Sequence, residues 1–304
     1  MDYQRILEQI YAEIRPFLSL GQVATYIPQL ALVPRERFGM AVHTPDGHLY
    51  AVGDAHQRFS AQSISKVFTL TLAMKLVGER LWERVGREPS GTAFNSLVQL
   101  EYERGIPRNP FINAGALVVT DVILGELADA DGAVLDFVRR LAGNPSVEYD
   151  LAVARSERAT GHRNAALAHL LKSFGNLHND ADRVLDAYVH DCSLAMSCVD
   201  VSRACLYLVN GGRSPHTGEQ VVSRSQAKYI KSLMLTCGTY DAVGDFAYRV
   251  GLPGKSGVGG GIVAVMPGEF SVCVWSPGLN ASGNSLAGTQ ALEWFTTETG
   301  ISIF

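Results

Sequence analysis

The sequence has little that would place it in a membrane or carry it across one. Its longest apolar stretches, near residues 67–77 and 112–127, are interrupted by Lys75 and Asp121. Each interruption comes before the roughly 18 apolar residues that a membrane-spanning helix needs. Charged side chains also fall where a signal peptide would have its apolar core, beginning with Asp2. We therefore expect no membrane association, and an amphipathic helix at the N-terminus.

Positive charge is scarce as well. The 26 Lys and Arg residues are outnumbered by 30 Asp and Glu residues, which gives a formal net charge of −4. No dense stripe of basic residues runs along any segment, so the chain has no electrostatic attraction for a phosphate backbone. We expect no nucleic-acid partner.

The common metal and disulfide patterns are missing too. The 5 cysteines are odd in number and include no C-x-x-C pair, and the 8 histidines include no H-E-x-x-H. Cys192, Cys198 and Cys205 do not have the spacing of zinc ligands. The sequence therefore predicts a cytoplasmic protein, kept in a reducing compartment, with no metal site.

No internal repeat and no linker rich in Pro, Gly and Ser divides the 304 residues, so we expect one domain over residues 1–304. Two segments have the composition of β-hairpins. Residues 38–54 contain a Pro-Asp-Gly turn, and residues 262–276 contain a Pro-Gly turn. Each turn is flanked by two short apolar runs, which predicts a pair of antiparallel strands.

Apolar residues recur at helical spacing between the two hairpins and again after the second. These helical patterns lie near residues 64–78, 113–128, 132–142, 164–174, 181–190, 197–209 and 285–297.

The predicted fold is therefore α/β (α+β), an antiparallel sheet flanked by helices with a large helical subdomain inserted. We place the sheet-containing subdomain at about residues 1–59 and 236–304, and the helical subdomain at about residues 60–235. The seam between them is the expected place for a cleft.

Residues 63–66 have the S-x-x-K form and lie where a helix is expected to begin. Positions i and i+3 of a helix share a face, so the Ser63 hydroxyl and the Lys66 amine can come within hydrogen-bond reach. The helix N-terminus adds N–H groups and partial positive charge, which favour an alkoxide. The alternative is that Ser63 caps the helix and Lys66 is a solvated surface charge.

A second S-x-x-K sequence runs from Ser225 to Lys228. Its segment also contains Lys231 and is typical of an exposed helix face, whereas Ser63 precedes the apolar run VFTLTLAMKLV. This context favours Ser63 as a nucleophile and Lys66 as its base.

A lysine acts as a base only after it has lost its proton. Lowering a lysine pKa from about 10.4 to about 7–8 requires roughly 4 kcal/mol of desolvation or repulsion from another cation. We expect burial of Lys66 in the cleft, with Lys255 as a cationic neighbour, to supply this.

Residues 255–257 have the K-[ST]-G form that accompanies S-x-x-K in penicillin-recognising enzymes, and they precede a predicted strand. Val258 and the three glycines after it would let backbone N–H groups approach a reacting oxygen. One interpretation is an oxyanion hole made by the amides of Ser63 and Val258. The other is a glycine-rich turn that leads into a strand.

Four longer sequence motifs resemble those of a known family. They are YIPQLA at 26–31, FSAQSISKVF at 59–68, NPFINAGA at 109–116 and GKSGVGGGI at 254–262. Together they closely resemble the serine-dependent glutaminases of the bacterial single-domain kind, from about residue 20 to the C-terminus. The resemblance implies a β-lactamase/transpeptidase-like fold that hydrolyses L-glutamine to L-glutamate and ammonia. It also implies a homo-oligomer, specifically a homotetramer, and no metal or organic cofactor.

The resemblance also implies roles for individual residues. Ser63 looks like the family's nucleophile and Lys66 like its base, and we add Tyr188 as a third catalytic residue. Besides Ser63, the positions that match its substrate-binding residues are Tyr26, Asn113, Glu157, Asn164, Tyr188, Tyr240 and Val258.

These residue types suit a free amino acid, which presents an ammonium, a carboxylate and a neutral amide. Glu157 can accept from the ammonium, and Asn113 and Asn164 can donate to the carboxylate. Tyr188 could pass protons, since a phenol both donates and accepts. Each has a structural alternative: Asn113 as a turn residue or cap, Glu157 as a surface partner of Arg158 or Arg155, and Tyr188 or Tyr240 as a core aromatic.

Two other functions remain open at this point. A β-lactamase or D-alanyl peptidase could use the same dyad, although no S-D-N or Y-x-N box lies between the two motifs. A scaffold or binding protein could keep the fold without the chemistry. Ammonia release from glutamine distinguishes all three.

Overall fold

The computed structural model describes residues 1–91 and 93–304. Its main sheet has five antiparallel strands in the order β2-β1-β8-β7-β6. The strands are β1 (Gly39–His43), β2 (Leu49–Gly53), β6 (Gly254–Ser256), β7 (Gly261–Met266) and β8 (Phe270–Trp275). Both predicted hairpins are confirmed, as β1–β2 and β7–β8. The strand β6 supplies the sheet edge on which Lys255 lies.

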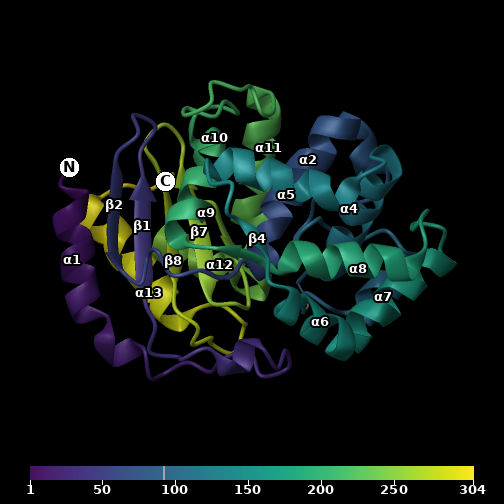
Figure 1. Ribbon diagram of the computed structural model, residues 1–304, viewed down its shortest axis with the longest axis horizontal. Helices are drawn as coiled ribbons and strands as arrows, with labels where there is room; N and C mark the ends of the chain where they lie inside the picture. The colour runs from purple at the N-terminus through teal and green to yellow at the C-terminus, as the bar shows by residue number, and fades with distance from the viewer. Residues whose placement is uncertain (92) are drawn as a thin grey trace.

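The two faces of this sheet are covered by different helices because side chains alternate along a strand. Ile262 and Val274 belong to one core cluster with α1 (Tyr3–Glu13), α12 (Val243–Val250) and α13 (Leu286–Thr299). Val263 and Cys273 face the opposite way, into the larger cluster with α9 (Cys198–Ala204) and α10 (Leu206–Val209). Figure 1 shows α1 beside β2 at one end of the molecule.

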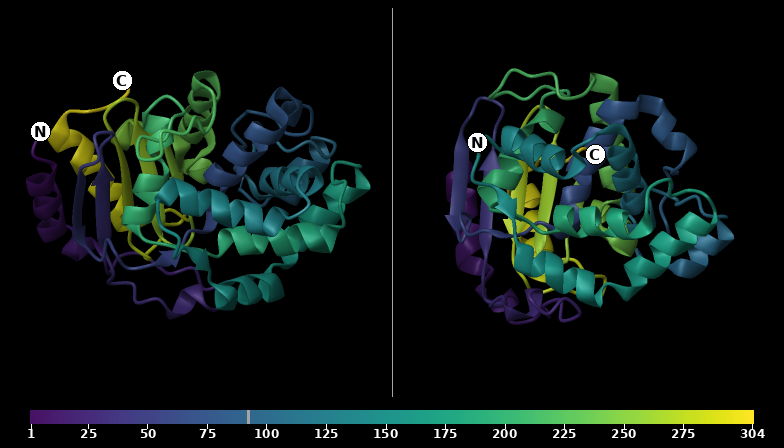
Figure 2. Two further views of the ribbon diagram at one scale, coloured as in Figure 1. Left: turned by 45° about the horizontal axis from the view of Figure 1, so that its top comes forward. Right: turned by 45° about the vertical axis from the view of Figure 1, so that its right-hand side comes forward.

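Helices make up most of the remaining chain and lie at the other end of the molecule (Figures 1 and 2). They are α2 (Ser65–Val77), α3 (Leu97–Tyr102), α4 (Asn113–Glu126), α5 (Ala130–Ala142), α6 (Leu151–Thr160), α7 (His162–Ser173) and α8 (Ala181–Cys192). The helix α11 (Arg224–Cys237) lies nearer the middle, where it contacts β6, α10, α12 and α2. The helix α2 is buried from Ser65 to Met74 and packs against α4, α5 and α8. The predicted helical patterns are confirmed within a few residues, except that the pattern near residues 197–209 forms two helices, α9 and α10, which are separated at Cys205.

The predicted N-terminal helix is present but shorter than its sequence pattern. Asp2 caps α1 by accepting a hydrogen bond from the Arg5 N–H at 3.1 Å. Leu7 and Ile10 turn toward the sheet core. The helix ends at Glu13, and Pro16 lies in the 3-10 turn η1 (Arg15–Phe17), because proline has no N–H for a continuing helix.

A second, three-stranded sheet was not predicted. It joins β3 (Phe59–Ser60), β5 (Leu194–Met196) and β4 (Glu148–Tyr149) in the order β3-β5-β4. Strands this short carry no readable alternation. The sheet matters for function because the Ala61 N–H donates to Leu194 O at 2.8 Å, which holds the segment before Ser63 against the end of α8.

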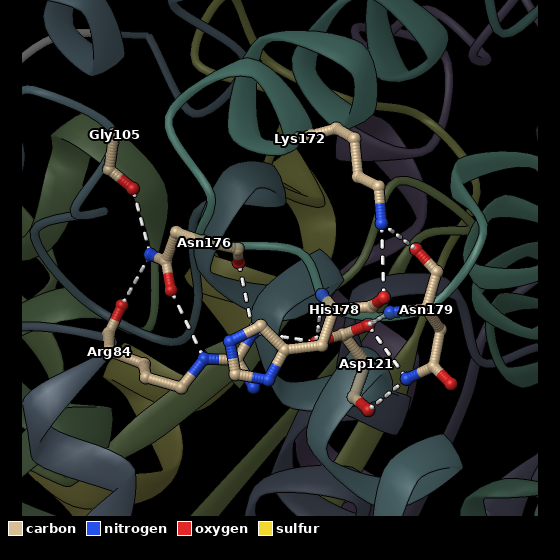
Figure 3. Close-up of polar contacts among 7 residues, drawn as sticks. All are labelled: Arg84, Gly105, Asp121, Lys172, Asn176, His178 and Asn179. Carbon is tan, nitrogen blue, oxygen red and sulfur yellow. Dashed lines mark hydrogen bonds and ion pairs between the residues drawn. The ribbon is translucent and has the colours of Figure 1, made fainter.

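A buried ion pair ties the helices together away from the main sheet (Figure 3). Asp121, in the middle of α4, accepts from Arg84 Nη2 at 2.6 Å and from the backbone N–H groups of His178 and Asn179 at 3.0 and 2.8 Å. Arg84 also bonds the side chain and carbonyl of Asn176 at 3.1 and 2.9 Å. These contacts fix α4 against the loop that leads into α8.

None of the helices in the described part of the chain is long and apolar enough to cross a membrane.

Candidate active site

Ser63 lies in a tight 3-10 turn, η3 (Gln62–Ile64), between β3 and α2. Gln62 has φ of 47°, a left-handed conformation that is costly for a residue with a side chain. Its amide Nε2 is held by Ser60 Oγ at 3.0 Å and Glu157 Oε2 at 3.2 Å. The strained turn presents Ser63, which is only 7% exposed, just ahead of the first residue of α2.

The Lys66 side chain extends from the first turn of α2 and is 2% exposed. Its Nζ donates to the side-chain Oδ1 of Asn113 at 2.7 Å and to the carbonyl of Phe111 at 3.2 Å. It also lies 5.7 Å from the ring centre of Tyr188. Burial lowers the pKa of Lys66 to about 8.

The sequence placed Ser63 and Lys66 on one face of a helix, within reach of a direct hydrogen bond. The structure starts α2 at Ser65, so Ser63 belongs to the preceding 3-10 turn. Among the contacts of the described residues, the Lys66 amine donates to the N-terminal region of α4 and not to Ser63. The two residues remain neighbours in a buried site.

Lys255 was expected to be the cation that lowers the pKa of Lys66. The structure reverses this relation. Burial and the charge of Lys66 hold the pKa of Lys255 well below its usual value, while burial alone lowers that of Lys66. Lys255 is 0% exposed and its Nζ donates to Gly238 O at 2.9 Å and Ser256 O at 2.5 Å.

The two candidate tyrosines of the site have different hydroxyl partners. The hydroxyl groups of Tyr240 and Ser63 share a hydrogen bond, and burial raises the pKa of Tyr240 to about 12. The hydroxyl of Tyr188, in contrast, pairs with the thiol of Cys192 one turn along α8, and burial raises its pKa well above the usual value. Tyr240 also has φ of 60°, and its ring packs 4.6 Å from that of Phe94.

The glycine-rich turn between β6 and β7 passes directly over the Ser63 turn. A methyl group at Gly257 would lie 3.2 Å from Ser63 N and 2.6 Å from Ala61 O, so only glycine allows this approach. The turn is closed by Gly257 N–H, which donates to Gly261 O at 2.9 Å. None of the hydrogen bonds between described residues uses the backbone N–H of Ser63 or Val258.

A cavity of about 90 Å³ opens onto Ser63. Its walls include the sequence-predicted residues Tyr26, Asn113, Glu157, Asn164 and Tyr188. Tyr26 stands at the mouth and is 57% exposed. Tyr240 and Val258, which the sequence also predicted, are not among the residues that line this cavity, although Val258 lines a second hollow of about 720 Å³ that shares Tyr26 as a wall.

The polar side chains of the cavity are connected to one another. Asn113 Nδ2 donates to Asn164 Oδ1 at 2.9 Å, so Asn113 links Lys66 to Asn164. Glu157 is buried, and burial raises its pKa to about 7 despite a hydrogen bond from Gln62. Arg158, the alternative partner of Glu157, instead pairs with two aspartates on α8.

Some residues of the site were not found from sequence. Gln62, Phe94 and Asn95 line the cavity, and Cys192 contacts Tyr188 beneath it. Gln62 lies inside the quoted string FSAQSISKVF, yet its left-handed backbone has no sequence signal, because glutamine has no preference for that region. Phe94 lies in a segment without hydrophobic periodicity, and only the tertiary structure brings it to the site.

The described residues contain no group of three or more His, Cys, Asp or Glu side chains arranged to hold a metal ion. The site therefore offers a buried hydroxyl, a neutral or cationic amine, two phenols, a carboxyl and free backbone N–H groups. This set can attack and transfer an acyl group.

Comparisons with known proteins agree on one family. The family model described as Glutaminase matches residues 21–304. A glutaminase of Ralstonia nicotianae is 62% identical over 304 residues, which is 100% of both chains. The similarity therefore covers every element described above.

Solved structures give the same result. A probable glutaminase of Bacillus subtilis has a TM-score of 0.90 and 35% identity, covering 99% of this chain and 96% of its own. A covalent complex of a Bacillus subtilis glutaminase with 5-oxo-L-norleucine, formed by its reaction with 6-diazo-5-oxo-L-norleucine, has a TM-score of 0.87 and 34% identity. It covers 100% of this chain and 99% of its own.

Proposed function

The chain belongs to the glutaminase family, and from this premise we propose that it hydrolyses glutamine by two-step acyl transfer through Ser63. Membership gives the β-lactamase-like fold and the hydrolysis of the glutamine side-chain amide. The mechanism is our proposal. The observation that carries it is the buried Ser63 hydroxyl, at the floor of a cavity and beside a lysine whose pKa is lowered to about 8.

Lys66 is the general base. A neutral amine has two N–H groups and one lone pair, and the two N–H groups of Lys66 are taken by Asn113 Oδ1 and Phe111 O. The lone pair is then the remaining position on the nitrogen. The two acceptors therefore orient the lone pair of Lys66 toward the hydroxyl proton of Ser63, three residues earlier in the chain.

The covalent steps balance without another reactant. Ser63 Oγ bonds to the side-chain amide carbon of glutamine while its proton passes to Lys66. The carbon–nitrogen bond then breaks, and ammonia leaves with that proton. Water hydrolyses the resulting glutamyl ester, which restores the Ser63 hydroxyl and releases glutamate.

The negative oxygen that forms in both steps is held by the backbone N–H groups of Ser63 and Val258. The glycine turn brings Val258 over the nucleophile, and neither N–H donates to another described group. Preorganised donors of this kind typically contribute about 3 kcal/mol to the transition state.

The phenol of Tyr240 forms a hydrogen bond with the Ser63 hydroxyl and so positions that hydroxyl for the reaction. Tyr188 contributes its ring beside the Lys66 amine, and its role in proton transfer stays a prediction. A Bacillus subtilis relative forms a covalent complex with a glutamine-like diazoketone, which supports a nucleophile in this family.

Glutamine is recognised at both of its charged ends. Glu157 accepts from the substrate ammonium, and Asn113 and Asn164 donate to its carboxylate. The hydrogen bond from Gln62 to Glu157 connects ammonium recognition directly to the turn that carries Ser63.

The test is the Ser63→Ala variant, assayed for ammonia release from glutamine and for hydrolysis of a chromogenic β-lactam. We expect ammonia release to be lost with the fold intact, and no β-lactam hydrolysis by either protein. The matched control is Ser225→Ala, which removes the exposed serine of the second S-x-x-K sequence and leaves the rate unchanged. Wild-type turnover in the Ser63→Ala variant would falsify the proposal.

We further propose a cytoplasmic homotetramer. The five cysteines are free thiols, the state that a reducing compartment maintains. Val98 and Tyr102, one turn apart on α3, are 81% and 85% exposed, which is the kind of apolar surface that an interface covers. Light scattering after gel filtration tests the assembly, and a monomer mass excludes it.

A further inference from the structure

Lys255 is a fully buried lysine that the proposed reaction leaves without a role. It lies in the middle of β6, paired with Val263 of β7. Paired residues of antiparallel strands point to the same face, and Val263 belongs to the core shared with the helices. The Lys255 side chain therefore points from the sheet edge toward the active site.

The Lys255 amine joins two backbone segments. It donates to Gly238 O at 2.9 Å and to Ser256 O at 2.5 Å. The same Gly238 carbonyl accepts the Ser256 N–H at 3.2 Å. Burial and the neighbouring charge of Lys66 lower the pKa of Lys255, and a neutral amine has two N–H groups for these two carbonyls.

Both segments control the position of Tyr240. Gly238 caps α11 two residues before Tyr240, and Ser256 O accepts the Tyr240 hydroxyl at 3.4 Å. The Lys255 Nζ also lies 4.6 Å from the centre of the Tyr240 ring. One amine thus contacts the backbone before Tyr240, its ring, and the acceptor of its hydroxyl.

Tyr240 needs such support because its backbone is strained. Its φ of 60° is a conformation that costs about 1–3 kcal/mol for a residue other than glycine, and it persists only where the surroundings hold it. Gly238 fits so closely under β6 that a methyl group there would lie 1.8 Å from Gly254 O.

We propose that Lys255 is a positioning residue for the glutaminase reaction, whose amine holds the Tyr240 phenol against Ser63. It acts through Tyr240 and does not touch the substrate. The inference rests on the proposed function, in which Ser63 is the nucleophile and Tyr240 hydrogen-bonds to it.

The first test replaces the amine by an apolar group of similar length, in Lys255→Met. Misplacement of a catalytic group by about 1 Å costs about 100-fold, so we expect kcat to fall by about 100-fold. KM should stay near that of the unchanged enzyme, because Lys255 does not line the cavity. The matched control is Lys231→Met, which removes a half-buried lysine bonded to Leu208 O at 2.9 Å and should leave both constants unchanged.

A double-mutant cycle with Tyr240→Phe separates positioning from general loss of structure. If Lys255 acts through the Tyr240 hydroxyl, Lys255→Met should slow the Tyr240→Phe enzyme little further. Losses that multiply across the two substitutions overturn the proposal. If Lys255→Met does not fold, the same double-mutant cycle can be measured with Lys255→Gln, which keeps N–H donors at this position.

The pH dependence of kcat/KM distinguishes a positioning role of Lys255 from an electrostatic effect on Lys66. A positioning role leaves the midpoint of the kcat/KM profile near 8 in Lys255→Met. A midpoint that moves upward shows that Lys255 acts as a charge on Lys66, which contradicts the proposal. The Ser63→Ala variant tests the nucleophile separately. If Ser63→Ala is active, the proposed mechanism is refuted. If Ser63→Ala is inactive but the losses from Lys255→Met and Tyr240→Phe multiply, only the role of Lys255 is refuted.

Discussion

At the scale of single residues, we expect the amine of Lys66 to determine the pH range in which the enzyme works. Burial lowers its pKa to about 8, and only the neutral amine can take the proton of Ser63. We therefore expect kcat/KM to rise with pH up to about 8, and kcat, measured at saturating glutamine, to fall about tenfold for each pH unit below that value. Initial rates of glutamate formation between pH 6 and 10 measure this. A flat profile over that range assigns the base to another group.

The carboxyl of Glu157 should govern substrate affinity instead of turnover. Its pKa is raised to about 7 by burial, so the carboxylate that we propose as the ammonium ligand is present above about pH 7 and lost below it. We expect KM for glutamine to fall as the pH rises from 6 to 8.

Replacing that carboxyl tests its role directly. Glu157→Gln removes a charge-assisted hydrogen bond worth about 2 kcal/mol, so KM should rise by roughly 30-fold and lose its dependence on pH in this range. The comparison is Arg158→Gln at the next position, whose partners lie outside the cavity and whose KM should not change. A KM for Glu157→Gln equal to the original contradicts ammonium recognition by this residue.

The sequence was enough to select these residues as candidates, but it did not predict their hydrogen-bond partners. S-x-x-K identified Ser63 and Lys66 because a hydroxyl and an amine at that spacing are local. Lys66 instead donates to Asn113, 47 positions away, and this contact depends on how α2 packs against α4. The reversed relation between Lys66 and Lys255 likewise follows from relative burial, which a sequence does not contain.

At the scale of elements, the Asp121 cluster is the principal polar connection between helices of the site. Burial opposes ionisation of Asp121, yet hydrogen bonds from His178, Arg84 and Asn179 outweigh it and hold the pKa of the carboxyl below its ordinary value. This fixes α4, which begins at Asn113, relative to the loop that precedes α8 (Figure 3).

We expect Asp121→Asn to lower the free energy of unfolding by about 3 kcal/mol at pH 7, because Arg84 is left without its anion and an amide N–H faces two backbone donors. The contribution of an ionised carboxyl with a depressed pKa is present above the unfolded value near 3.9 and lost in stronger acid. The difference from wild type should therefore shrink at pH 3.

Urea unfolding at both pH values measures this difference. Asp186→Asn is the matched control, since Asp186 pairs with Arg158 at the surface, where an ion pair contributes about 0–1 kcal/mol. Equal losses of unfolding free energy in the two variants would show that the buried Asp121 cluster stabilises the protein no more than a surface ion pair does.

Elements were predictable where a local rule determines them. Turn residues identified both hairpins, and the 3.6-residue period identified α2, α4 and α8. The short strands β3, β4 and β5 were not predicted, because each has only two or three residues and pairs with a segment far away in the sequence. They are nevertheless what places the Ser63 turn beside α8.

At the scale of the whole molecule, the sheet and the helices share one large core. Val263 and Trp275 of the sheet belong to the same cluster of buried side chains as α2 and α4. The Trp275 ring stacks on Phe59 at 5.2 Å, and its Nε1 donates to Gly259 O at 3.0 Å. The active-site cavity therefore sits on a continuous packed interior.

From this shared core we expect the two predicted subdomains to unfold as one cooperative unit. Tryptophan fluorescence can report on each half, because Trp82 lies among the helices and Trp275 in the sheet. Variants that lack Trp294 and keep only Trp82 or only Trp275 should give the same urea midpoint. Separate midpoints would show that residues 60–235 unfold independently of the sheet.

The overall architecture was predicted from sequence more completely than its internal contacts. A sheet built from both ends of the chain with helices between them follows from the order of the patterns. The placement of Gly257 over Ser63 does not, because it requires the two halves to be docked.

All five thiols of this enzyme are enclosed by protein, and none takes part in the proposed acyl transfer. A cysteine introduced at an exposed position such as Tyr248 would then be the sole sulfhydryl open to a maleimide. The molecule is thus ready for single-point attachment to a dye, an electrode or a resin, with no prior removal of native cysteines.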